Sequence, residues 1–143
     1  MILLDANVLI YAHDETSPHH GASRQWLEDA FSESDEVAIA LVSLLAFLRV
    51  MTNPGLFDAP MSVAQAVEIV TEWLSLPNVG VAQPTRRHFE HVVQLARSGK
   101  VWGPMLMDAH LAALAIEHGA TLCTTDRDFA RFKGLRTEDP LGS

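Results

Sequence analysis

Short runs of apolar residues alternate along this chain with longer segments in which apolar residues recur every three or four positions. The short runs predict four buried strands, at residues 1–4, 37–41, 79–82 and 121–125. The longer segments have the period of an amphipathic helix and predict helices between these strands. Strands that alternate with helices are typical of a parallel sheet covered on both faces. We therefore expect an α/β fold of three layers, α/β/α, around a mostly parallel sheet of four or five strands.

Residues that favour helix ends mark the bounds of the predicted helices. Ser17 and Ser62 are good N-cap residues, and a proline follows Ser17 at the first helical position. A proline ends the apolar run "LVSLLAFLRVM". Gly99 and Gly119 end two later helices, the second of which reads "LMDAHLAALAIE". No internal repeat or linker interrupts this order, so we expect a single domain over residues 1–143.

The composition is that of a globular protein of the cytosol. The chain has 143 residues, 48% of them hydrophobic, and no stretch is long and apolar enough to cross a membrane. It lacks a signal-peptide pattern, and its one cysteine, Cys123, cannot form an internal disulfide, so we expect a cytoplasmic location without membrane contact. The formal net charge of −8 argues against nonspecific nucleic-acid binding. Carboxylates that hold cations would also contribute to this negative charge.

Three aspartates interrupt apolar surroundings in distant parts of the chain. Asp5 follows the first predicted strand, and Asp126 follows the last one. The carboxyl ends of parallel strands meet at one edge of a sheet, where ligands bind. Asp108 lies in the first turn of a helix among leucine and alanine residues, where the helix dipole favours its charge by only about 0.3–1 kcal/mol. We therefore expect the three carboxylates to converge at the carboxyl edge of the sheet.

A divalent cation would resolve the mutual repulsion of three such carboxylates. Mg²⁺ and Mn²⁺ prefer carboxylate oxygens and keep waters for a phosphate substrate, so the pattern favours a metal site that hydrolyses phosphodiesters. Asn7 and the hydroxyls of Thr124 and Thr125 are candidates to orient an acid or a metal-bound water.

Each acid taken alone also has a structural interpretation. Asp5 could cap the helix that follows it, and Asp108 could interact with the dipole of its own helix. Asp126 and Asp128 could be ordinary turn residues. Because apolar residues flank all of these sites, a common metal site is favoured over several separate structural roles.

The same segments resemble the PIN-domain ribonucleases, in particular the VapC-type toxins of bacterial toxin–antitoxin pairs. The resemblance rests on "LLDANVLIYAHD", "SPHHGASRQWLE" and "FLRVMTNP", and most specifically on "DAHLAALAIEHGATLCTTDRDFARFKGL". The terminal "EDPL" also matches a common ending of the family. The resemblance implies a PIN-like fold and a Mg²⁺- or Mn²⁺-dependent endoribonuclease that cuts RNA. It also implies a homodimer and a cognate VapB-like antitoxin whose tail fills the active-site groove.

The resemblance further implies roles for individual residues. Asp5, Asp108 and Asp126 match the metal-holding acids of the family. Asp128 matches an auxiliary acid of some members, and Asn7 matches the polar residue that follows the first acid. We therefore predict a catalytic set of these five residues, with the metal bound by the first three.

One position departs from the family pattern. The family usually carries a glutamate just before the "FLRV"-like run, where this chain has Ala46. Asp14, Glu15 or Asp128 could substitute for it, or the site could work with fewer ligands or weakly. This gap keeps open an alternative function, a catalytically weak or inactive PIN-like module that binds RNA or protein. A phosphohydrolase of the haloacid-dehalogenase kind is disfavoured, because that chemistry needs a second acid where the chain has Asn7.

Other residues carry weaker signals. Arg127 and Arg131 follow Asp126 and are the basic residues nearest in sequence to the predicted metal site, and we predict that they contact RNA. Trp102 and the methionines of the apolar segments, Met107 among them, are expected in the core, and Cys123 is expected to be a buried hydrophobic residue. The seven histidines do not have the spacing of a zinc site, which favours surface and capping roles for them.

Overall fold

The computed structural model describes residues 1–33 and 35–142, and its elements alternate as the hydrophobic pattern predicts. The strands are β1 (Ile2–Leu4), β2 (Val37–Ala40), β3 (Val79–Ala82), β4 (Thr121–Cys123) and β5 (Thr137–Glu138). The α-helices are α1 (Ala6–Tyr11), α2 (His20–Ser32), α3 (Leu41–Met51), α4 (Val63–Ser75), α5 (His88–Ser98) and α6 (Leu106–Glu117). Two short 3₁₀ helices are η1 (Gly103–Met105) and η2 (Arg127–Arg131).

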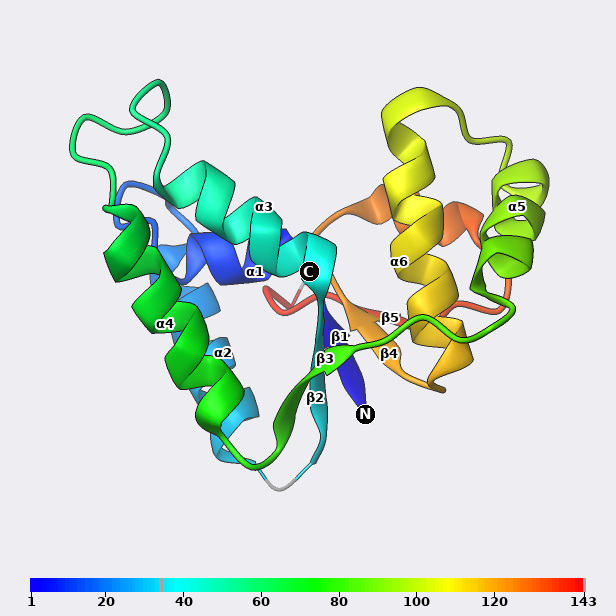
Figure 1. Cartoon of the computed structure of the whole chain (residues 1–143), viewed down its shortest axis with the longest axis horizontal. Coiled ribbons are helices and arrows are strands. Elements are labelled where there is room, and N and C mark those ends of the chain that lie inside the picture. Colours follow the sequence, from blue (N-terminus) through cyan, green and yellow to red (C-terminus); the bar gives the residue numbers. More distant parts are fainter. Residues whose placement is uncertain (34, 143) are drawn as a thin grey trace.

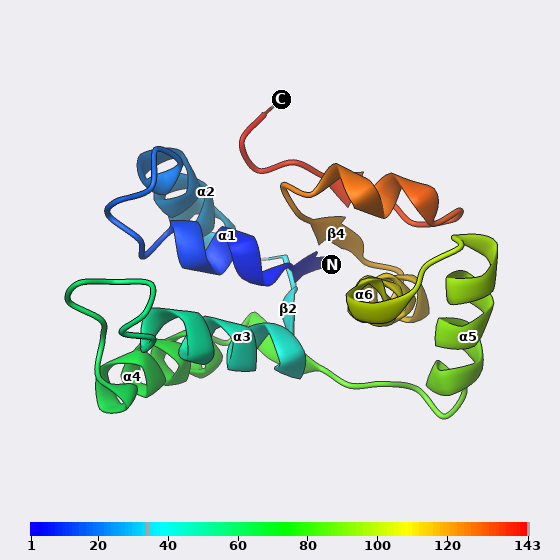
Figure 2. The same ribbon diagram turned by 90° about the horizontal axis from the view of Figure 1, so that it is seen from above.

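The five strands form one parallel sheet in the order β3-β2-β1-β4-β5, with β1 at its centre. Helices α1 to α4 lie on one side of this sheet, and α5 and α6 lie on the other (Figure 1). The view from above shows the same division into two helical layers (Figure 2). The prediction of a three-layer α/β/α fold with a parallel sheet is therefore confirmed.

Successive residues of β1 point to opposite faces of the sheet and so belong to two separate cores. Leu3 packs with α6 and η2, in a cluster that includes Leu122 and Phe129. Leu4 packs with the helices of the other layer, in a cluster that includes Ile39 and Phe47. Both faces of the central strands are thus covered, which explains their continuous apolar runs.

Local signals set most of the helix ends. Ser62 caps α4, and a reciprocal hydrogen bond from Gln65 completes a capping box. Gly119 ends α6 with a φ of 62°, a conformation that favours glycine. The prediction that Ser17 caps the second helix is wrong: α2 begins at His20, because the Ser17 hydroxyl accepts a hydrogen bond from the amide of His19 in a turn before the helix. In the described part of the chain, no helix is long and apolar enough to cross a membrane.

Candidate functional site

The register of the central strands brings Asp5 and Thr124 together. Leu4 pairs with Cys123, so the next residue on each strand lies at the carboxyl edge of the sheet beside its neighbour. The Thr124 hydroxyl donates a hydrogen bond to Oδ2 of Asp5 at 2.7 Å, and the amide of Ala6 donates to Oδ1 at 2.7 Å. Asp5 is therefore buried and fixed through both of its oxygens. Its predicted role as a helix cap is confirmed, because it is the N-cap of α1.

Thr124 also connects Asp5 to the acids that follow β4. The amide of Asp126 donates a hydrogen bond to the Thr124 hydroxyl at 3.0 Å, and the amide of Asp128 donates to Oδ1 of Asp126 at 2.8 Å. The interpretation of Asp126 as a turn residue is therefore confirmed, since its side chain caps the 3₁₀ helix η2. These hydrogen bonds place Asp126 and Asp128 at the same edge of the sheet as Asp5.

Asp108 lies in the first turn of α6, and the negative charges of the other acids affect its pKa. Burial raises the pKa of Asp108, and the charges of Asp126, Asp5 and Asp128 raise it further, to about 6, whereas Arg131 lowers it. Burial also raises the pKa of Asp5, against the hydrogen bonds from Thr124 and Ala6 that lower it. The charges of the three other acids thus act on Asp108, so the predicted acids lie in the same region of the molecule, which we call the acidic cluster.

The donor chemistry of this cluster fits a hard divalent cation. All its side-chain ligand atoms are carboxylate or hydroxyl oxygens, and burial together with the charges of Asp126, Asp5 and Asp128 raises the pKa of Asp108. Within the described residues, however, no three histidine, cysteine or acidic side chains stand close enough to enclose a metal ion. Mg²⁺ is usually held by one or two carboxylates and several waters rather than by a closed protein cage. The cluster therefore fits an open cation site.

A cavity of about 560 Å³ opens next to the cluster and contains the position that departs from the family pattern. Asp5, Asp108, Ala46 and Arg49 line it, together with Ser43. The Ser43 hydroxyl is buried and has no hydrogen-bond partner in the described part of the molecule. Ala46 thus leaves open space beside the two acids, with a cationic side chain one helical turn further along α3.

Two of the three acids that could replace the family glutamate are remote from the cluster. Asp14 and Glu15 line a different cavity, and Asp14 accepts hydrogen bonds from the amide and hydroxyl of Thr16. Neither acid contributes to the raised pKa of Asp108, whereas Asp128 does. Asn7 lies in the first turn of α1, but no hydrogen bond among the described residues joins its amide to Asp5.

The predicted RNA contacts and the single cysteine have distinct surroundings. Arg131 lies close enough to Asp108 to lower its pKa, and its Nε donates a hydrogen bond to the carbonyl of Asp128 at 3.1 Å. Arg127 is exposed at the start of η2. Cys123 is fully buried as expected, and burial raises the pKa of its thiol to about 12, with Glu138 contributing. A neutral thiol of this kind does not act as a nucleophile at neutral pH.

Two expectations about the core are wrong. Trp102 is 71% exposed, and Met107 is 50% exposed. Trp102 is the residue before η1, and Met107 lies in the first turn of α6, so both are where the chain enters this helix. The prediction that the Thr124 hydroxyl orients an acid is confirmed by its hydrogen bond to Asp5. Ser43 was not predicted, because in the sequence it is only a polar residue within an apolar run.

Comparisons with known proteins agree with this architecture. The family model described as PIN domain matches residues 2–135. Ribonuclease VapC37 of Mycobacterium tuberculosis is 42% identical to the chain over 140 residues, with 98% of this chain and 97% of that protein covered. Ribonuclease VapC33 of the same organism is 34% identical over 141 residues, with 99% of each covered.

Solved structures share the fold at lower identity. VapBC-1 from nontypeable Haemophilus influenzae has a TM-score of 0.70 at 20% identity, with 98% of each chain covered. Mycobacterium tuberculosis VapC20, a sarcin-ricin loop cleaving toxin, has a TM-score of 0.67 at 19% identity, with 95% of this chain and 99% of that one covered.

Proposed function

Because the chain belongs to the PIN domain family and is related over its full length to VapC ribonucleases, we propose that it is an endoribonuclease and the toxin of a toxin–antitoxin pair. The observation that supports this proposal is that Thr124 connects Asp5, which follows β1, with Asp126, which follows β4, and that the charges of both acids act on Asp108 of α6. The reaction is the hydrolysis of RNA phosphodiester bonds.

The site depends on a divalent cation in this proposal, with Mg²⁺ or Mn²⁺ as the cation. Asp5, Asp108 and Asp126 would hold it, and it would supply a polarised water and neutralise the charge that develops on the phosphate. The hydrogen bonds from Thr124 and Ala6 fix the orientation of the Asp5 carboxylate before any ligand arrives. Asp128 adds negative charge near Asp108, and we assign to Asn7 the role of orienting a water.

Cationic side chains near the acids would hold the RNA backbone. Arg131 already lies beside Asp108, and Arg127 is exposed on the same short helix. Guanidinium groups bind phosphate oxygens through two parallel hydrogen bonds, so these residues would position the strand without reading its sequence.

We also propose partners for the protein. A cognate VapB-like antitoxin would bind it, as solved structures of this fold include VapBC toxin–antitoxin complexes. We further propose that it forms a homodimer and that it acts in the cytoplasm, where its RNA substrates are.

The test is cleavage of cellular RNA by the purified protein with Mg²⁺ or Mn²⁺, followed by mapping of the cut ends. We expect EDTA, Asp5→Asn and Asp108→Asn each to abolish cleavage, and both variants to relieve growth arrest on expression. Asp58→Asn is a matched control, because Asp58 is an exposed acid on the loop after α3. Arrest that persists in both site variants would contradict the nuclease proposal.

Ala46 is the observation that favours the alternative, a catalytically weak or inactive module that binds RNA or protein. Its place in the cavity beside Asp5 and Asp108 leaves the site one carboxylate short of the family pattern. RNA binding without cleavage at any concentration of Mg²⁺ or Mn²⁺ would support this alternative over the nuclease.

A further inference from the structure

Helix α3 begins at the carboxyl edge of the sheet, next to Asp5. Leu4 of β1 pairs with Ile39 of β2. The next residue on each strand, Asp5 and Ala40, therefore lies at this edge, and α3 starts directly after Ala40. Residues of α3 line the cavity of about 560 Å³ together with Asp5 and Asp108, and we refer to it as the α3 cavity.

The first turn of α3 has no side-chain cap. The first amides of any α-helix have no acceptor within the helix, and a side chain at the N-cap often accepts from them. Ser62 does so for α4, and Asp5 does so for α1. The N-cap of α3 is Ala40, which has no polar side chain, and no other side chain of the described residues takes its place. The positive end of the helix dipole is therefore available beside Asp5.

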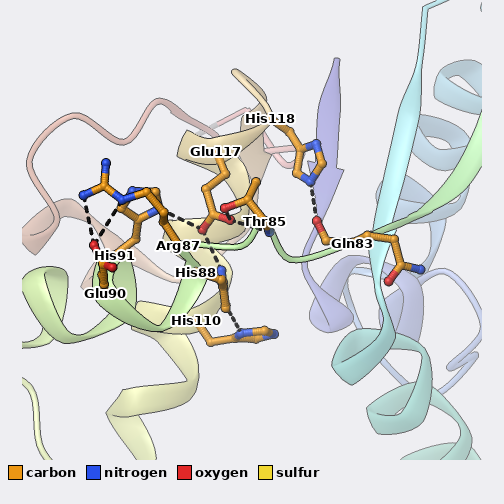
Figure 3. A network of polar contacts seen from close by, with 9 residues as sticks. All are labelled: Gln83, Thr85, Arg87, His88, Glu90, His91, His110, Glu117 and His118. Carbon is orange, nitrogen blue, oxygen red and sulfur yellow. Dashed lines mark hydrogen bonds and ion pairs between the residues drawn. The ribbon is translucent and has the colours of Figure 1, made fainter.

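A buried hydroxyl in the same turn lacks a partner. Buried polar side chains nearly always have one. In the opposite helical layer, Glu117 accepts hydrogen bonds from the amide and hydroxyl of Thr85, and Nδ1 of His88 lies 2.6 Å from its Oε2 (Figure 3). Ser43 is 2% exposed, and its hydroxyl has no hydrogen-bond partner among the described residues. Ser43 lines the α3 cavity, so a ligand in this cavity can supply the missing partner.

One more buried hydroxyl of the described residues shares this property. Ser23 on α2 is fully buried, and its hydroxyl has no partner either. Ser23 does not line the α3 cavity, however, so no ligand in this cavity can reach it. The missing partner of Ser43 points to a ligand only because it is combined with a cavity and with an uncapped helix end.

A cation lines the same cavity. Arg49 lies further along α3 and is exposed. It forms no hydrogen bond or ion pair with another described residue. The charge of Arg131 lowers the pKa of Asp108, whereas Arg49 is not among the groups that shift the pKa of Asp108 or Asp5. The guanidinium of Arg49 is thus not bound to these acids and can bind an anion.

Ala46 keeps the space between these groups open. Ser43, Ala46 and Arg49 are spaced by three residues, so they follow one another along the helix surface. All three line the α3 cavity, and the methyl group of Ala46 fills little of it. An anion of the size of a phosphate can therefore reach Ser43 and Arg49 together.

We propose that the α3 cavity binds a phosphate of the RNA backbone through the first-turn amides of α3, the Ser43 hydroxyl and the Arg49 guanidinium. The amides and the hydroxyl donate hydrogen bonds to phosphate oxygens, and Arg49 supplies the positive charge. Because Asp5 and Asp108 line the same cavity, the phosphate lies beside the acids that would hold the cation. This inference rests on the ribonuclease function proposed above and adds the residues of α3 that position its substrate.

A water bound to the cation fits this set of groups less well. The Ser43 hydroxyl could bind either a water or a phosphate, since a hydroxyl both donates and accepts. The amides and the guanidinium can only donate, and the charge of Arg49 would repel a divalent cation beside it. The donors therefore suit an anion.

The experiment follows the amide NMR signals of the full-length protein. Leu41, Val42 and Ser43 report on the first turn of α3. Inorganic phosphate is titrated with and without Mg²⁺, and a short single-stranded RNA is titrated in EDTA so that it stays intact. We expect phosphate to shift these signals in a saturable way, Mg²⁺ to strengthen its binding, and RNA to shift the same signals. An effect of inorganic phosphate without an effect of RNA would mean an adventitious ion only and would overturn the proposal.

Ser43→Ala tests the hydroxyl, with Ser23→Ala as its matched control. We expect Ser43→Ala to weaken phosphate binding about tenfold, as the loss of a hydrogen bond to a charged group does. Neither variant should melt below the wild type without ligand, because a buried hydroxyl without a partner costs stability. Ser23→Ala should bind phosphate as the wild type does. A lower melting temperature of Ser43→Ala with unchanged phosphate affinity would assign Ser43 a structural role instead.

Two further variants test the charges. Arg49→Gln should weaken RNA binding and lower its dependence on salt, whereas Arg24→Gln, at an exposed position of α2, should do neither. Ala46→Glu adds a negative charge between Ser43 and Arg49 and should weaken phosphate binding in EDTA. Phosphate affinity that is unchanged in both Arg49→Gln and Ala46→Glu would place the anion outside the α3 cavity and overturn the proposal.

Calorimetry with Mn²⁺ separates a phosphate from a metal-bound water. Ser43→Ala should bind Mn²⁺ as the wild type does, and in RNA cleavage it should raise KM more than it lowers kcat. Weaker Mn²⁺ binding with unchanged phosphate binding would show that Ser43 holds a metal-bound water, and the proposal would be wrong.

The two proposals can fail separately. If the wild type cleaves RNA, and Ser43→Ala and Arg49→Gln change neither phosphate affinity nor KM, the phosphate site is wrong and the nuclease stands. If phosphate and RNA shift the signals of α3 in a protein that never cleaves RNA, the nuclease proposal fails and the phosphate site stands.

Discussion

Replacement of Asp108 by asparagine should stabilise the metal-free protein at alkaline pH, although it removes a predicted metal ligand. The folded protein raises the pKa of Asp108 from 3.8 to about 6. The folded state therefore holds this proton more tightly than the unfolded state does. The resulting contribution to stability is fully present below pH 3.8 and is lost as the pH rises through about 6.

The size of the effect follows from the shift. A rise of about 2 pKa units corresponds to about 3 kcal/mol, at about 1.36 kcal/mol per unit. Asp108 is only half-buried, so solvent screening reduces the expected cost of its charge to about 1 kcal/mol. Asparagine has nearly the same shape but no charge and avoids this cost. For a domain of this size, the melting temperature should rise by about 2–4 °C.

The assay is thermal unfolding followed by circular dichroism in EDTA, at about pH 4 and about pH 8. Asp108→Asn should melt above the wild type at the higher pH and close to it at the lower pH. Mn²⁺ should then stabilise the wild type more than the variant, because the cation relieves the same repulsion. Asp58→Asn should show neither effect. A variant that melts below the wild type at the higher pH in EDTA would refute repulsion among the acids.

Three further substitutions test other parts of the structure. Thr124→Val removes the side-chain hydrogen bond to Oδ2 of Asp5, and we expect it to cost about 1–3 kcal/mol in urea unfolding and to weaken Mn²⁺ binding about 10–100-fold by calorimetry, with Thr125→Val as control. Ala46→Glu adds a carboxylate to the cavity beside Asp5 and should lower metal-free stability while it raises Mn²⁺ affinity; unchanged affinity would exclude this cavity from the metal site. Glu117 has a lowered pKa, so its stabilising contribution is present above pH 4.5 and is lost as the pH falls toward about 2, and Glu117→Gln should flatten the acid limb of the stability profile. A variant profile parallel to that of the wild type would contradict this role.

The strands were predictable because both faces of the central sheet are covered. Residues 79–82 form β3 as predicted, and the ends of the other three predicted strands differ by one or two residues. Strand β5 has only Thr137 and Glu138, both exposed, and a polar pair at a sheet edge leaves no hydrophobic pattern to detect. The start of α2 was wrong for a related reason, since the Ser17 hydroxyl serves a turn as readily as a helix.

The acids of the candidate site were predictable from one rule, that strands of a parallel sheet carry their ligands at the carboxyl edge. The hydrogen bond between Thr124 and Asp5 was harder to predict. It depends on the pairing of Leu4 with Cys123, and the sequence of one strand does not determine the register with its neighbour. Asp14 and Glu15 are near Asp5 in sequence only. The six residues of α1 carry the chain about 9 Å from the sheet edge before it reaches them.

Helical periodicity predicts that a face is apolar but does not predict what covers it. The spacing of Phe89, Val92, Val93 and Ala96 correctly predicted α5, yet α6 covers only part of this face. Met107 was misplaced in the core for the same reason. Apolar residues that a compact domain leaves exposed together usually have a function, and here they adjoin the acidic cluster.

The distribution of charge reconciles an acidic protein with a nucleic-acid substrate. A net charge of −8 excludes binding of RNA over the whole surface. The cations are instead placed locally, with Arg131 beside Asp108 and with Arg49 at the α3 cavity. If the protein is the proposed nuclease, repulsion elsewhere on the surface would keep an RNA strand near Arg131 and the acids whose charges act on Asp108.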